Sequence, residues 1–184
     1  MQNNFKHIFS LAVKNDRLAQ KNIYEMFSGK MLAIAKSYVN SKEDAEDVLV
    51  TAFCKAFSRI KDCRDAQSFP FWLRKIVVND SISFIRKNKN ILYSDAGNVE
   101  EIGDEILDEN EQNFPDFEVE KVLEQMPLGY KLVFNLYIFE DKKHQEIAEI
   151  LNISEGTSKS QLNKTKKWLV EFFNKKENEK FIKK

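Results

Sequence analysis

Glycine and proline, the residues that most often interrupt regular secondary structure, are rare in this sequence. Its 184 residues include five glycines and three prolines, against fifteen phenylalanines. A strand-rich chain would need many more turns, and turns are built mainly from glycine, proline and small polar residues. The scarcity therefore predicts an all-α protein made of long amphipathic helices. With 42% hydrophobic residues, such a chain can bury the cores of two small domains.

Charge divides the chain into three segments, although its formal net charge is zero. Residues 1–90 hold 16 basic against 9 acidic residues, a net charge of +7. Residues 91–126 hold 1 against 12 (−11), and residues 127–184 hold 12 against 8 (+4). Two basic ends around an acidic strip favour polyanion binding by the ends. Ordinary solvated surface charge explains any one segment, but it explains the three together less readily.

The spacing of apolar residues predicts two small helical domains, residues 1–90 and 116–175. Residues 91–115 are acidic and weakly periodic, so we expect them to form a linker. Residues 176–184 are expected to form a fraying basic tail. In the first domain, helices are expected at residues 3–15, 18–39, 43–61 and 69–88. The second domain is expected to break at Pro127 and Asp141 and to end in a long helix reaching about Phe173.

Few residues are available for catalysis or metal binding. Cys54 and Cys63 have no further cysteine near them, which predicts two unpaired thiols. The two histidines, His7 and His144, are far apart in the sequence. The sequence therefore predicts a protein that is not an enzyme and needs no metal or cofactor. It contains neither an apolar run of membrane-spanning length nor a signal-like leader, so we expect a cytoplasmic protein without membrane insertion.

Residues 44–60 have the pattern of a single amphipathic helix. Asp44, Glu46 and Asp47 lie in its first turn, where carboxylates complement the helix dipole, and this stabilising role is sufficient to explain them. The polar face offers an alternative, because acids mixed with small apolar groups are typical of a helix that docks on a basic partner helix. The apolar stripe consists of Ala45, Val48, Leu49, Ala52, Phe53, Ala56, Phe57 and Ile60. The polar face consists of Glu43, Asp47, Val50, Thr51 and Cys54.

Residues 69–88 are expected to form a second helix, and Ser68 is placed to cap its start. Only a narrow polar window remains on the surface of this helix. At 100° per residue, the apolar side chains fall on two arcs. The window between the arcs can bind phosphates and offer a ring to an unstacked base, although a solvated strip explains it equally well. One arc holds Trp72, Leu73, Ile76, Val77 and Phe84, and the other holds Phe71, Val78, Ile82 and Ile85. The window holds Lys75, Asn79 and Arg86, with Ser83 and Trp72 at its edge.

Residues 144–173 have the pattern of a helix-turn-helix. A short apolar-faced helix is followed by the turn Asn152–Ser154 and by a long helix that Ser154 is placed to cap. Small residues at the start of the long helix permit close approach to a DNA groove, and lysines further along can reach phosphates. We therefore expect this face to contact DNA. The alternative is a lysine-rich face that is only solvated. Its residues are Gly156, Ser160, Asn163, Lys164 and Lys167, flanked by Thr157 and Lys159.

These three stretches, in this order and separated by an acidic linker, resemble the extracytoplasmic-function sigma factors. Such proteins are small two-domain subunits that direct bacterial core RNA polymerase to promoters. DAEDVLVTAF resembles the family's polymerase-clamp-binding helix, FPFWLRKIVVNDSISFIRK its minus-ten helix, and ISEGTSKSQLNKTKKWL its minus-thirty-five recognition helix. The resemblance implies a sigma region 2 bundle at residues 1–90 and a region 4 helix-turn-helix at residues 116–175.

The resemblance also assigns roles to individual residues. It implies that promoter DNA is recognised at two elements and melted at the minus-ten element, where the loop DCRDAQS helps to capture a flipped base. Polymerase binding falls to Asp44, Glu46, Asp47, Val50 and Thr51. Minus-ten contacts fall to Trp72, Lys75, Asn79, Ser83 and Arg86. Minus-thirty-five contacts fall to the seven residues of the helix-turn-helix face, Gly156, Thr157, Lys159, Ser160, Asn163, Lys164 and Lys167.

Some positions depart from the family pattern. Val50 and Thr51 stand where a glutamine and an acid are usual, so the polar part of the polymerase interface is expected to differ. Ser83 stands where an aspartate is usual, and Ser158 is expected on the buried side of the recognition helix. The family further implies a linker that threads toward the polymerase active centre, and an anti-sigma factor as a partner. The alternatives are an ordinary helix-turn-helix regulator, which would bind duplex DNA tightly by itself, and a helical protein-interaction module.

Overall fold

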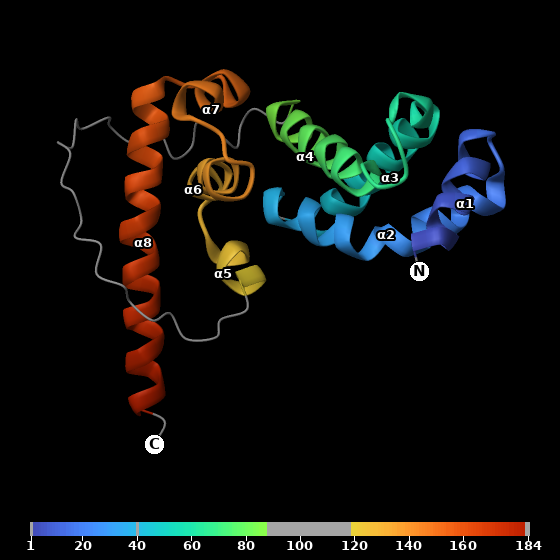
Figure 1. Cartoon of the computed structure of the whole chain (residues 1–184). Coiled ribbons are helices and arrows are strands. Elements are labelled where there is room, and N and C mark those ends of the chain that lie inside the picture. The colour runs from blue at the N-terminus through green and yellow to red at the C-terminus, as the bar shows by residue number, and fades with distance from the viewer. Residues whose placement is uncertain (1, 40, 88–118, 183–184) are drawn as a thin grey trace. The chain divides into compact units, whose positions relative to one another are not determined.

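The computed structural model describes residues 2–39, 41–87 and 119–182, and every regular element within these ranges is a helix (Figure 1). The expected all-α class is confirmed. The chain divides into two compact units, Met1–Lys89 and Asn90–Lys184. The region 91–115, where we expect the acidic linker, lies outside the described residues. No described helix is both long and apolar enough to cross a membrane.

The first unit is a bundle of helices whose starts are fixed by capping side chains. Asp16 accepts a hydrogen bond from the Ala19 N–H at 2.8 Å, and Ser41 accepts one from the Asp44 N–H at 3.0 Å. Each satisfies a backbone donor that the first turn of a helix leaves without a partner. The helices are α1 (Gln2–Val13), α2 (Arg17–Tyr38), α3 (Lys42–Ser58) and α4 (Phe69–Lys87), with a short 3-10 turn, η1 (Ile60–Asp62), after α3.

Phe69, at the start of α4, is the centre of an aromatic core. Its side chain is fully buried, and its ring centroid lies 5.6 Å from both Phe9 and Phe27 and 6.0 Å from Phe5. Burying a phenylalanine stabilises a fold by about 1.5–3 kcal/mol, so this cluster ties α1, α2 and α4 together. The stripe expected on α3 is also buried, with Phe57 partly so, and packs against α2 and α4.

Within residues 119–182, the second unit contains four helices and a π-helical turn. Its breaks fall as expected, since α5 ends just before Pro127 and the π-helical turn ends just before Asp141. The prediction of a fraying tail at residues 176–184 is wrong up to Ile182. Helix α8 continues past Phe173 and ends at that residue. The elements are α5 (Val119–Gln125), α6 (Leu128–Phe134), η3 (Asn135–Phe139), α7 (His144–Leu151) and α8 (Glu155–Ile182).

The core of the second unit lies along α8, against which α5, α6 and α7 pack (Figure 1). Val122 and Leu123 of α5, and Met126 just after it, are buried beneath aromatic side chains of α6 and α8. The interface is not wholly apolar, because the Lys131 side chain of α6 is also buried. Burial lowers the pKa of Lys131, and Glu124 partly opposes that effect. The aromatic side chains on this core are Tyr130, Phe134, Trp168, Phe172 and Phe173.

Candidate polymerase and nucleic-acid interfaces

The outward face of α3 combines acidic residues with a solvent-exposed apolar side chain. Asp47 and Thr51 are exposed, and Val50 between them leaves 56% of its surface in water. Asp44 is half-buried, and Glu46 lies 3.6 Å from Lys42 in an exposed ion pair within the helix. Such exposed pairs contribute little to stability, so Glu46 remains available to a partner. All five residues expected to bind polymerase therefore have solvent access on one helix.

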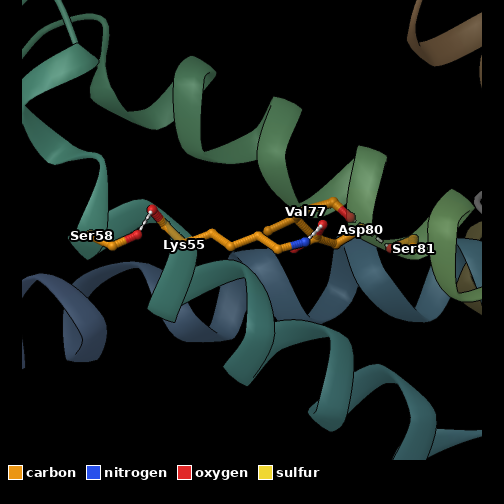
Figure 2. Close-up of polar contacts among 5 residues, drawn as sticks. All are labelled: Lys55, Ser58, Val77, Asp80 and Ser81. Carbon is orange, nitrogen blue, oxygen red and sulfur yellow. Dashed lines mark hydrogen bonds and ion pairs between the residues drawn. The ribbon is translucent and has the colours of Figure 1, made fainter.

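Lys55 of α3 and Asp80 of α4 join the two helices (Figure 2). The Lys55 ammonium lies 2.5 Å from Oδ1 of Asp80, whose side chain is only 9% exposed. The other carboxylate oxygen of Asp80 is buried without a hydrogen-bond partner. Asp80 is not among the residues predicted from the sequence. Helical periodicity could have indicated it, because at 100° per residue Asp80 lies on the apolar arc of Leu73 and Val77.

Polar side chains form one exposed row along α4. Lys75, Asn79, Ser83 and Arg86 all face water and follow one another at steps of three or four residues, so neighbours lie on one side of the helix. This is the predicted polar window. It carries cations and hydrogen-bonding groups but no exposed carboxylate, because Asp80, the acid of α4, is buried.

The two aromatic residues at the start of α4 differ in exposure. Trp72, expected at the edge of the window, is half-buried and lies 5.9 Å from the Phe69 ring. Phe71, placed by the sequence on the second apolar arc, is 77% exposed, so it does not share the burial of that arc. The arc itself is buried at Val78, Ile82 and Ile85. Phe71 lies about two turns before Val78, where its side chain is left in water.

Hydrogen bonds to Asp65 order the loop before α4. Its Oδ1 accepts from both the backbone N–H and the hydroxyl of Ser68, at 2.8 and 2.7 Å. These bonds hold the pKa of Asp65 below its ordinary value, because they favour the charged carboxylate. Ser68, expected to cap α4, thus donates its hydroxyl to Asp65. The loop also holds the buried Cys63, whose thiol donates to the Asp65 carbonyl at 3.4 Å and whose pKa is raised by burial.

The helix-turn-helix has the predicted three-residue turn between α7 and α8. Asn152 adopts the left-handed conformation, with φ of 55°, and the Ile153 N–H donates to the Ala148 carbonyl at 3.0 Å. This arrangement is typical of a helix C-terminus. Ser154 then accepts from the Thr157 N–H at 2.9 Å, which confirms the expected cap of α8.

The face of α8 expected to contact DNA is accessible to solvent, although one of its lysines is ion-paired and several of its residues are half-buried. Gly156 and Lys167 are exposed, and Lys159 forms a 2.9 Å ion pair with Glu155. The remaining residues of the face, Thr157, Ser160, Asn163 and Lys164, are half-buried. On the opposite side Ser158 is fully buried, as expected.

His144 links the two helices of the motif. Its Nδ1 lies 2.9 Å from the Ser158 hydroxyl, and its ring stacks on Tyr137 with centroids 5.0 Å apart. Burial lowers the pKa of His144, and the nearby Lys159 ammonium adds to that effect, while Glu155 opposes it. These contacts give His144 a packing role between α7, α8 and the π-helical turn. Among the described residues, no three metal-binding side chains are close enough together to hold an ion.

Comparison with known proteins identifies both units. The Sigma-70 region 2 family model matches residues 23–91, and the Sigma-70, region 4 model matches residues 116–169. RNA polymerase sigma factor SigV of Bacillus subtilis is 33% identical over 70% of this chain and 75% of its own length. ECF RNA polymerase sigma-E factor of Haemophilus influenzae is 27% identical over 81% of this chain and 84% of its own length.

Two further proteins show similarity over most of the chain. ECF RNA polymerase sigma factor SigW of Bacillus subtilis is 28% identical over 82% of this chain and 87% of its own length. A solved structure of CnrH in complex with the cytosolic domain of CnrY matches 92% of this chain and 96% of its own, with a TM-score of 0.48 and 14% identity. With both family regions matched in order and a relative above 30% identity, this chain belongs to the extracytoplasmic-function group of the sigma-70 family of transcription initiation factors.

Proposed function

We propose that this non-catalytic initiation factor binds core RNA polymerase through α3, reads the minus-ten element with α4 and the minus-thirty-five element with α8, and promotes melting at the minus-ten element. The observation that carries the proposal is the exposure of the same helix faces that the family resemblance assigns to these tasks. In α3 and α4, each such face lies opposite a stripe that is buried in the bundle core. Partners can therefore contact these faces without disturbing the packed core.

Polymerase binding is assigned to the acidic face of α3. Asp44 and Asp47 supply charge that complements a basic partner helix, and Val50 supplies the apolar contact. Val50 and Thr51 replace the usual glutamine and acid, so this interface relies more on apolar contact than is usual in the family.

Minus-ten recognition is assigned to the α4 row and the loop before it. Lys75 and Arg86 suit phosphates, while Asn79 and Ser83 suit base edges. Trp72 lies at the edge of this row. The loop around Asp65 receives a flipped base, and the free energy of unstacking must be offset by such contacts.

Minus-thirty-five recognition is assigned to α8. Gly156 and Thr157 lie in its first turn, where a recognition helix meets base edges in the major groove. Ser160 and Asn163 continue that face as base-reading residues. The lysines, Lys159, Lys164 and Lys167, bind phosphates.

The remaining partners follow from the family. The acidic linker, residues 91–115, threads into the polymerase, an anti-sigma factor holds the free protein inactive, and the protein acts in the cytoplasm. Because residues 91–126, which include this linker, have a net charge of −11, they compete with DNA for the basic faces of the free chain.

The test is co-purification of the full chain with core RNA polymerase, followed by run-off transcription from candidate promoters. We expect a stoichiometric complex and promoter-dependent transcripts. Labelled promoter duplex is then titrated with the full chain, with and without core polymerase, at moderate salt. Binding is expected to be weak without polymerase. Tight, sequence-specific binding by the chain alone would contradict the proposal and indicate an ordinary helix-turn-helix regulator.

A further inference from the structure

Phe71 has the largest exposed fraction, 77%, among the exposed large hydrophobic side chains of the described residues. It belongs to the first turn of α4. Two residues before it, Phe69 is fully buried at the centre of the aromatic core, and one residue after it Trp72 packs against Phe69. The core of this unit is therefore complete without Phe71, and folding alone does not explain its side chain.

Phe71 heads the exposed polar row of α4. Lys75 lies four residues after it and Asn79 four residues after that, and both are exposed. Side chains at such spacing are neighbours on the helix surface, with Cβ atoms about 5–6 Å apart. The Phe71 ring and the Lys75 ammonium are therefore close enough to contact the same ligand.

The charge of the row favours a nucleic acid over an apolar protein surface. Around Phe71, the exposed side chains of α4 are cationic or hydrogen-bonding, and the acid of this helix, Asp80, is buried against Lys55. A docking protein helix would need further apolar groups beside Phe71. An unstacked nucleotide needs one ring face and one cation, and both are present.

We infer that Phe71 is the stacking platform for one unpaired base of the separated minus-ten strand, with Lys75 holding a phosphate of the same strand. Trp72 commits part of its ring to Phe69, whereas the Phe71 ring is open to water. This inference rests on the proposed function and adds a residue that the sequence had placed on an apolar arc, outside the polar window. Stacking holds the opened strand, so Phe71 acts after the base pairs separate.

The test compares holoenzymes carrying Phe71→Ala, Phe71→Leu and Phe71→Trp. Each is titrated with a single-stranded minus-ten oligonucleotide and with a pre-melted promoter. We expect Phe71→Ala to weaken oligonucleotide binding about 5- to 150-fold, the equivalent of ~1–3 kcal/mol for one stacked base. Phe71→Leu should weaken it similarly, and Phe71→Trp should retain it. The matched control is Leu18→Ala, which removes a 67% exposed side chain from the first turn of α2.

A second readout locates the stacked base. 2-Aminopurine is placed at successive positions of the non-template strand, and its fluorescence should be quenched at one position by the wild type but not by Phe71→Ala. Equal oligonucleotide binding by wild type and Phe71→Ala would overturn the inference while leaving the proposed function intact. Reduced affinity of Phe71→Ala for core polymerase would instead identify a protein contact and also overturn it. If wild-type holoenzyme itself fails to bind promoter DNA, the proposed function fails.

Discussion

Lys55 and Asp80 form an ion pair that connects the helix assigned to polymerase with the helix assigned to the minus-ten element (Figure 2). The Asp80 carboxylate is buried, whereas the Lys55 side chain remains 53% exposed. A buried carboxylate is costly unless a charge or hydrogen bonds compensate it. The pair therefore sets how α4 is held against α3, and with it the position of Asn79, the residue next to Asp80.

Removing Lys55 should destabilise the first unit, because Asp80 would remain buried without its cation. Lys55→Met is expected to lower the free energy of unfolding by about 1–3 kcal/mol, a range kept modest because Lys55 is half exposed. Adding Asp80→Leu should recover most of the loss, since a packed apolar pair often replaces a buried ion pair without loss. The measurement is urea unfolding followed by Trp72 fluorescence in a Trp168→Phe background. The control, Lys21→Met, breaks the exposed pair with Glu25 and should change little.

The ion pair also shows what the sequence could not provide. Helical periodicity predicted all four helices of the first unit, because an amphipathic stripe is a local pattern. It placed Asp80 on an apolar arc, but the partner lies 25 residues earlier in another helix. Only tertiary packing brings Lys55 to that position.

Phe71 was misplaced for a related reason. A helical wheel gives the direction of each side chain, but not how far along the helix its neighbours cover it. The arc of Phe71 is buried at Val78 and Ile82, yet the first turn of that arc is uncovered. The end of α8 was placed too early because its apolar periodicity stops near Phe173. The charged residues that follow are good helix formers, and the helix continues to Ile182.

The start of α7 offers a stabilising substitution. Lys143 is its N-cap, and a lysine side chain has no acceptor for the free N–H groups of the first turn. Glu146 does reach back to the Lys143 N–H at 3.0 Å. Lys143→Ser should complete this capping box and stabilise the second unit by about 1 kcal/mol. Urea unfolding followed by Trp168 fluorescence in a Trp72→Phe background measures the change. Lys142→Ser, one residue outside the cap, should give no gain.

His144 should make the second unit less stable in mild acid. Its folded pKa lies below the ordinary value of 6.5, chiefly through burial and then through Lys159. The unfolded chain then binds more protons, so the free energy of unfolding should fall as pH drops from about 7 through 6.5 and below. Above about pH 7.5 both states are neutral at this residue, and it should add no pH dependence.

The substitution His144→Gln tests this assignment. It removes the titrating group while retaining an acceptor for the Ser158 hydroxyl. The difference between unfolding at pH 7.5 and pH 6 should shrink in the variant, with Trp168 fluorescence again reporting on the second unit. A pH dependence that persists unchanged in His144→Gln would show that other groups produce it.

Charge reversal on α3 should separate polymerase binding from folding. Asp44→Lys with Asp47→Lys is expected to weaken core-polymerase affinity at least tenfold, because it presents like charge to a basic helix. Circular dichroism should show nearly unchanged helix content, since the buried stripe is untouched and Ser41 still caps α3. Glu25→Lys on α2 serves as the control for a general charge effect. Unfolding of the double variant, or normal polymerase binding, would show that the acids only stabilise the helix start.

The residues of α8 should divide into phosphate-binding and base-reading groups. Lys164→Ala is expected to weaken holoenzyme binding to all promoters and to reduce the salt slope by about one, because one counterion fewer is released. Ser160→Ala and Asn163→Ala should instead change the preference among minus-thirty-five sequences, each by about 1–3 kcal/mol at the base that is read.

Lys159 provides an internal comparison with Lys164. Its ammonium is held 2.9 Å from Glu155, so DNA must compete with that carboxylate for it. Lys159→Ala should therefore weaken binding less than Lys164→Ala. Glu155→Gln should strengthen binding to every sequence, because it removes a negative charge from the DNA face and breaks the ion pair with Lys159. The measurement is promoter affinity of each holoenzyme across several salt concentrations. Equal losses on all sequences for Lys164, Ser160 and Asn163 variants would contradict the division of roles on this helix.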